Sequence, residues 1–76
     1  MIYPIKIKNE DDVVRVSNEA AKSGLDLSVA CGSAMIDPRS LLGLYNFVGK
    51  DAYLVAEDNV CPRYFQKLVE RMRVSA

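Results

Sequence analysis

Histidine is absent from this chain of 76 residues. Imidazole is the side chain whose ordinary pKa lies between about pH 5 and 8. Its absence therefore excludes a histidine metal site, a histidine general base and a phosphohistidine. No other residue pattern replaces that chemistry, so the sequence predicts no catalytic residue, no metal site and no cofactor.

Cysteine is scarce, since Cys31 and Cys61 are the only two and they lack C-x-x-C spacing. The sequence alone does not exclude a disulfide between them. Our interpretation is two buried, reduced thiols in a cytosolic protein. Neither thiol has a histidine or a nearby second cysteine in sequence to support catalysis.

Long apolar runs and an excess of charge are absent as well. No run approaches the roughly 20 residues that span a bilayer, and the first residues lack the basic region and apolar stretch of a signal peptide. Ten basic residues balance ten acidic ones, which argues against nucleic acid as a partner. A chain this short forms one core. We therefore expect one cytoplasmic domain over residues 1–76, with no membrane or nucleic-acid partner.

Hydrophobic periodicity predicts seven elements in the order β-α-β-β-α-β-α. Strands are expected near residues 3–8, 25–29, 33–36 and 52–56, the last a nearly continuous apolar run that suits a central strand. Helices are expected from the polar segment 9–12 to Gly24, from about 38 to 47, and after Asn59, its expected cap. This order predicts an α+β fold with a four-stranded, mostly antiparallel sheet and helices on one face. A ferredoxin-like fold with an extra C-terminal helix fits the pattern equally well.

The start of the middle helix is the most informative stretch. Asp37 and Pro38 are typical of a helix start. Ser40 then lies either inside the first turn or at the cap, where backbone N–H groups and the helix dipole favour negative charge. One helix turn cannot bury both Leu41 and Leu42 on the same side. Leu41 shares the face of the other apolar residues and is expected in the core, so Leu42 is expected at the surface.

The run Arg39-Ser40-Leu41-Leu42-Gly43-Leu44 resembles the regulatory-serine segment of the HPr family, the small phosphocarrier proteins of the bacterial sugar phosphotransferase system. That segment has a basic residue, a serine, two large apolar residues, a glycine and another apolar residue. Residues 56–59 and the last amphipathic helix also resemble the end of the family's fold. The resemblance implies an open-faced sandwich of four strands and three helices. It also implies phosphorylation at Ser40 and partner contacts through Arg39, Leu41, Leu42 and Gly43.

The loop after the first strand departs from the family, whose phosphorylated histidine lies there with glycine, arginine and proline around it. Here that loop is shorter and acidic, with Asn9, Glu10, Asp11 and Asp12. Three neighbouring carboxylates repel a phosphate dianion. Carboxylates could also suggest a divalent cation, but we interpret these residues as capping and helix-dipole groups. Arg15 is too late in the chain to replace the family's arginine and is expected on the exposed face of the helix.

These patterns lead to one main hypothesis and two alternatives. The first is a non-enzymatic, HPr-like regulatory or adaptor protein without histidine chemistry, similar in kind to the catabolite-repression HPr-like protein and switched by phosphorylation of Ser40. Its partners would be a serine kinase, a transcriptional regulator or other phosphotransferase-system proteins. The second is an HPr-derived interaction module that is never phosphorylated. The third, an enzyme or a phosphocarrier that uses a carboxylate, has no supporting motif.

Overall fold

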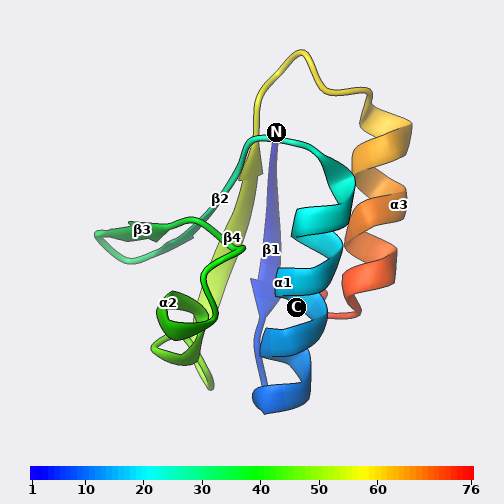
Figure 1. The fold of residues 1–76 in the computed structure, drawn as a ribbon. Coiled ribbons are helices and arrows are strands. Elements are labelled where there is room, and N and C mark those ends of the chain that lie inside the picture. Colours follow the sequence, from blue (N-terminus) through cyan, green and yellow to red (C-terminus); the bar gives the residue numbers. More distant parts are fainter.

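The computed structural model describes residues 1–76 and contains four strands and three helices (Figure 1). The helices α1, α2 and α3 lie on the same side of the sheet. The elements in chain order are β1 (Ile2–Lys6), α1 (Glu10–Ser23), β2 (Leu27–Cys31), β3 (Ala34–Ile36), α2 (Leu41–Tyr45), β4 (Asp51–Ala56) and α3 (Pro62–Met72).

The strands form one sheet in the order β1-β4-β2-β3, and every neighbouring pair is antiparallel. β4 lies between β1 and β2, which confirms the central strand predicted from its apolar run. Ile5 faces Ala52 across the first pair, and Val29 faces Leu54 across the second. The predicted α+β sheet with helices on one face is therefore confirmed, and the ferredoxin-like alternative, with its different strand order, is not the topology formed.

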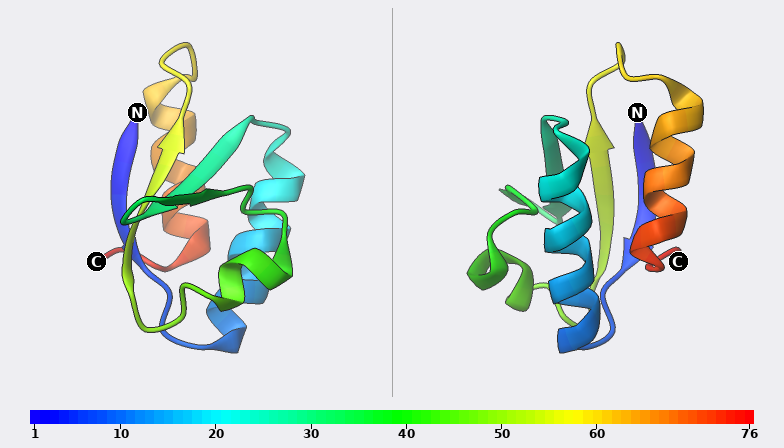
Figure 2. Two further views of the ribbon diagram at one scale, coloured as in Figure 1. Left: turned by 90° about the vertical axis from the view of Figure 1, so that its left-hand side faces the viewer. Right: turned by 45° about the vertical axis from the view of Figure 1, so that its right-hand side comes forward.

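The hydrophobic core fills the space between the sheet and the helices. Period-two alternation turns Ile5, Val29 and Leu54 inward, and helical periodicity turns Val16 and Leu68 toward them. The opposite face of the sheet carries no helix, and Figure 2, left, looks directly onto it. No helix in the structure combines the length and the apolar character that crossing a bilayer requires.

The helix ends follow the sequence at α1 but not at α3. Asn9 caps α1 and Gly24, with a φ of 69°, ends it. The expected cap of α3 at Asn59 is wrong, because Cys61 occupies that position and Pro62 is the first helical residue. Proline fits there because its missing N–H would have no partner in the first turn.

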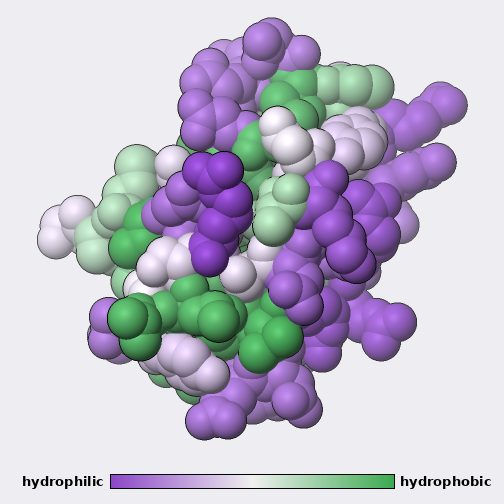
Figure 3. Space-filling model, viewed as in Figure 1, coloured by the Kyte–Doolittle hydropathy of each residue, from purple (hydrophilic) through white to green (hydrophobic).

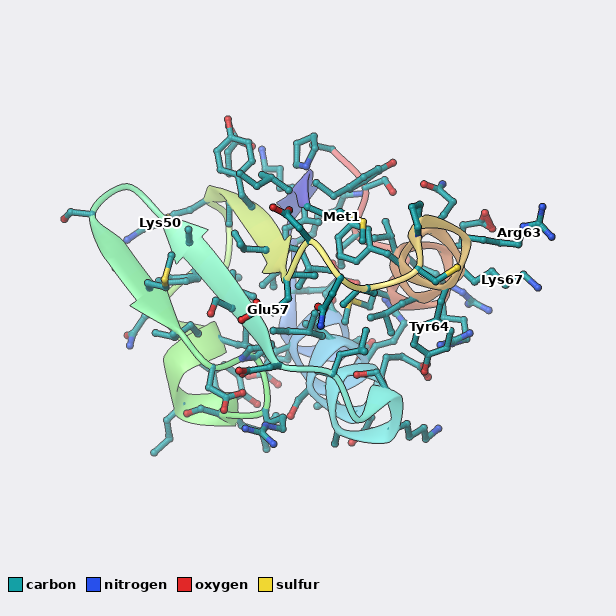
Figure 4. The ribbon with its side chains drawn as sticks, turned by 90° about the horizontal axis from the view of Figure 1, so that it is seen from above. Met1, Lys50, Glu57, Arg63, Tyr64 and Lys67 are labelled. Atoms are coloured by element: carbon teal, nitrogen blue, oxygen red, sulfur yellow. The ribbon has the colours of Figure 1, made fainter.

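The polar side of α3 is solvated, as its periodicity predicts. Figure 4 shows Arg63 and Lys67 pointing away from α3 into solvent. Tyr64 lies at the border of this face, and its hydroxyl donates a 3.2 Å hydrogen bond to the carbonyl of Ser23 at the end of α1. This bond fixes the end of α1 against the beginning of α3.

After α3 the chain turns back to the free edge of β1. Arg73 adopts a left-handed conformation with a φ of 57°, which reverses the chain, and Val74 is fully buried. The Lys6 N–H donates a 2.7 Å hydrogen bond to the carbonyl of Val74, and Ser75 pairs with Ile5. Residues 74–76 therefore cover the outer edge of β1 from Pro4 to Lys6.

Candidate functional site

The helix α2 is shorter than the sequence predicts. It spans Leu41–Tyr45, whereas the expected helix ran from about 38 to 47. At its start, Asp37 and Pro38 belong to a turn, which the Ser40 N–H closes with a 2.9 Å bond to the Asp37 carbonyl. At its end, Phe47 donates to the carbonyl of Leu44 at 2.9 Å, a tighter pattern than that of an α-helix.

Ser40 is the cap of α2, the second of its two expected positions. Its Oγ accepts a 3.3 Å hydrogen bond from the Gly43 N–H, and its carbonyl accepts from the Leu44 N–H at 3.1 Å. The residue is exposed. Ser40 therefore combines a weak structural bond with a hydroxyl that solvent and other molecules can reach.

Arg39 is held by Asp37 rather than free to meet another anion. Its Nε donates to Asp37 Oδ1 at 3.0 Å and its Nη2 to Oδ2 at 2.6 Å. This side-chain pair, together with the Arg39 backbone N–H, lowers the pKa of Asp37 to about 2. The same contact raises the pKa of Arg39. Arg39 and Asp37 therefore form an exposed ion pair at this surface.

Leu42 is exposed as predicted, with 81% of its surface accessible, but Leu41 is also 44% exposed. The expectation that Leu41 belongs to the core is wrong, because α2 begins only at Leu41 and a helix this short buries a single large side chain, that of Leu44. Tyr45 is partly exposed as well. We call Leu41, Leu42 and Tyr45 the α2 patch. Figure 3 shows hydrophobic side chains gathered over α2, in the lower left of the view.

Gly43 lies half-buried against β3. A Cβ atom at this position would be 2.9 Å from Ile36 Cδ1 and 3.4 Å from Ile36 Cβ. The glycine therefore lets α2 approach the side chain of Ile36 closely. This gives Gly43 a packing role, and its contact with a partner stays a prediction.

A second link positions the start of α2 relative to α1. The hydroxyl of Ser17, a buried residue of α1, donates a 3.1 Å hydrogen bond to the carbonyl of Arg39. The segment before Ser40 is thus tied to the middle of α1, which keeps the α2 patch at a defined place on the surface.

The acidic loop is engaged in holding α1. Asn9 Oδ1 accepts a 3.0 Å bond from the Asp12 N–H, and the buried Asp12 carboxylate accepts from the Lys8 N–H and from Arg15 Nη1, both at 2.8 Å. Glu10 and Asp11 are exposed in the first turn. No group of three or more potential metal-ligating side chains comes together in the structure.

Arg15 is half-buried, so the expectation of an exposed helix residue is wrong. Besides the Asp12 carboxylate, its Nη1 contacts the carbonyl of Met72 at 3.3 Å. Arg15 therefore joins the start of α1 to the end of α3. The sequence contains no sign of this contact, because the two residues are 57 positions apart.

The cysteines are both free, and the prediction of two buried thiols is wrong, because Cys61 is exposed and Cys31 is only partly buried. Cys31 is half-buried, and its Sγ donates to the Asp51 carbonyl at 3.4 Å. The backbone N–H groups of Tyr64 and then Arg63, at the start of α3, lower the pKa of Cys61, although no capping hydrogen bond of good geometry forms. Pro62, which fixes the helix start, is the signal that could have placed Cys61 there.

Comparison with known proteins shows the fold. No protein-family model matches the chain, and no curated protein matches it significantly. Among solved structures, the chain is similar to a histidine-containing phosphocarrier protein, in a structure described as evidence for the divergence of Mycoplasma from Gram-positive bacteria. The two share 12% identity with a TM-score of 0.71, over 95% of this chain and 91% of the other. At that identity the likeness establishes an HPr-like fold.

Proposed function

We propose that this chain is a non-enzymatic regulatory or adaptor protein that binds proteins of the bacterial phosphotransferase system through the α2 patch. The observation that carries the proposal is the exposure of Leu41 and Leu42 on a helix tied to α1 and β3. The HPr-like fold supports the choice of partner class. The absence of histidine removes the family's carrier chemistry.

The α2 patch has the composition of a small, transient interface. Its exposed apolar side chains are flanked in the sequence by exposed polar residues, Ser40, Asn46 and the Asp37–Arg39 pair, and an apolar centre with a polar rim is typical of such an interface. The patch is smaller than the interface of a permanent complex. We therefore expect a partner that binds weakly and reversibly.

Phosphorylation of Ser40 would change the rim of this patch. A phosphate adds about −1.5 to −2 charges beside Leu41. The residue before Ser40 is the cation Arg39, which already binds Asp37 through two nitrogens. Phosphoserine and Asp37 would therefore compete for Arg39. Without a kinase, Ser40 remains a cap and the patch binds constitutively.

A carboxylate phosphocarrier is less well supported. Both oxygens of Asp12 already accept hydrogen bonds, and Arg15 is bound to Asp12 and Met72. Glu10 and Asp11 are accessible but add like charge to an incoming phosphoryl group. The acidic loop therefore acts in this proposal as the support of α1.

The binding proposal is tested by isotope-labelled NMR titration with Enzyme I, an HPr serine kinase and an HPr-binding transcriptional regulator. We expect shifts centred on α2 with at least one of them. Leu42→Ser should weaken binding about tenfold or more. The matched control is Met35→Ser, a similarly exposed apolar residue on β3, which should bind normally. Shifts centred elsewhere, or equal losses in both variants, would contradict the proposal.

Intact mass spectrometry separates the alternatives. With ATP and an active HPr serine kinase, gain of one phosphate that Ser40→Ala abolishes supports the switch. No gain favours the constitutive module. With phosphoenolpyruvate and Enzyme I we expect no phosphate, and stable transfer would overturn the non-carrier proposal.

A further inference from the structure

The face of the sheet turned away from the helices is apolar at its centre. Ile2, Met35 and Tyr53 are 68%, 63% and 51% exposed. Together with Ala30 and Val55 they line a shallow hollow of about 360 Å³ that contains no polar lining residue. These residues come from all four strands. The face is open in the view of Figure 2, left.

The two ends of this face differ in charge. At the end where β4 finishes, the apolar hollow continues through Val55 into a second one of about 310 Å³, lined by Asp26, Glu57 and Asp58. The N-terminal ammonium of Met1 pairs with Asp58 at 3.1 Å, and the other two carboxylates keep this end acidic. At the other end, Lys6 of β1 lies opposite Asp51 of β4 in the strand register, and Lys50 precedes Asp51 in the chain. The face is thus negative at one end, apolar in the middle and basic on balance at the other.

We propose that this outer face binds a second copy of the same chain, with the two sheets stacked and their strands antiparallel. A two-fold axis between the sheets, perpendicular to the strands, reverses the ends of the second copy. The acidic end of each chain then lies over the Lys6 end of its partner, while the apolar centres cover each other. Face-to-face packing of two sheets needs a separation of about 10 Å, which side chains of this size fill.

The size of the face sets the expected affinity. The face is four strands wide, at a spacing of about 4.8 Å, and about five residues long, at a rise of about 3.3 Å per residue. Its projected area is therefore roughly 300 Å². Stable dimers bury about 800 Å² per partner. The dimer is therefore weak, with a Kd on the order of 0.1 mM, and forms only at high local concentration.

Sedimentation equilibrium of the full chain, from about 10 µM to about 1 mM, tests the proposal. We expect a monomer–dimer equilibrium. Tyr53→Lys and Met35→Lys should each raise the Kd of the dimer at least about tenfold, because each places a charge in the apolar centre. Leu42→Lys, on the α2 patch, is the matched control and should leave the Kd of the dimer unchanged. Circular dichroism melting shows whether each variant is folded.

A charge exchange tests the antiparallel arrangement. Lys6→Glu or Glu57→Lys alone should weaken the dimer several-fold, and the double variant should restore it, because each intermolecular pair is then re-formed in reverse. A monomer throughout the concentration range would overturn the proposal. A dimer whose Kd is unchanged by Tyr53→Lys and Met35→Lys would also overturn it. So would a charge-exchanged double variant that forms a weaker dimer than either single variant.

Discussion

The starts of α1 and α2 are capped by the same kind of hydrogen bond but have different roles in the molecule. At α1, Asn9, Asp12 and Arg15 satisfy one another and reach the end of α3. At α2, the Ser40 cap is weaker and the next two side chains are exposed. A helix start whose polar groups are paired internally supports the fold. One that leaves apolar side chains in solvent is available to a partner.

The largest expected effect is at α1. Asp12→Ala leaves the Lys8 N–H without its acceptor and the half-buried Arg15 with only its 3.3 Å contact to the Met72 carbonyl. It should lower the free energy of unfolding by about 2–3 kcal/mol. Urea denaturation measures this loss. Asp12→Asn keeps an acceptor for Lys8 and should lose less. A change below about 0.5 kcal/mol in Asp12→Ala would show that α1 does not depend on this network.

Removing the two caps compares the helix starts directly. Asn9→Ala should cost about 1–1.5 kcal/mol and Ser40→Ala about 0.5 kcal/mol. The difference is expected because α1 has 14 residues and α2 has five, and because the Ser40 bond is longer. Urea denaturation of both variants gives the ranking. An equal or reversed ranking would remove the distinction between a supporting and an available helix start.

Gly43→Ala tests how closely α2 rests on β3. Alanine gains helix propensity of up to about 1 kcal/mol over glycine, but its Cβ would meet Ile36 Cδ1 at 2.9 Å, and overpacking costs about 1–3 kcal/mol. We expect a net loss of about 0.5–1 kcal/mol in thermal or urea unfolding. Ile36→Val removes Cδ1, so Gly43→Ala should become neutral or stabilising in that background. The same loss in both backgrounds would contradict the proposed contact.

The smallest effect concerns the rim of the α2 patch. The pKa of Asp37 is lowered from 3.8 to about 2 by Arg39. A lowered carboxyl pKa contributes stability above the unfolded value, and that contribution is lost as the pH falls from about 4 to about 2. Carboxyl NMR titration should give a midpoint near 2 for Asp37. In Arg39→Ala the midpoint should rise toward 3.8, and an unchanged midpoint would exclude Arg39 as the cause.

Much of the fold was predictable because its signals are local. Alternation in β1, the apolar run of β4, the Asn9 cap and Gly24 each act over a few residues. The exposure of Leu42 followed from the same kind of argument, since two adjacent leucines point in different directions on a helix.

The errors have a tertiary origin. Leu41 is exposed because α2 begins only at Leu41 and is five residues long. Arg15 is half-buried because α3 returns to α1. Neither of these features has a periodic signal in the sequence.

The return of residues 74–76 along β1 has a consequence for aggregation. An uncovered edge strand offers unpaired N–H and C=O groups on which another chain can add a strand and begin a fibril. Here one edge is occupied by the chain's own hydrogen bonds to Lys6 and Pro4, and the other, β3, is only three residues long. Growth of the sheet by strand addition is therefore hindered at one edge, from Pro4 to Lys6, and restricted at the other by the shortness of β3.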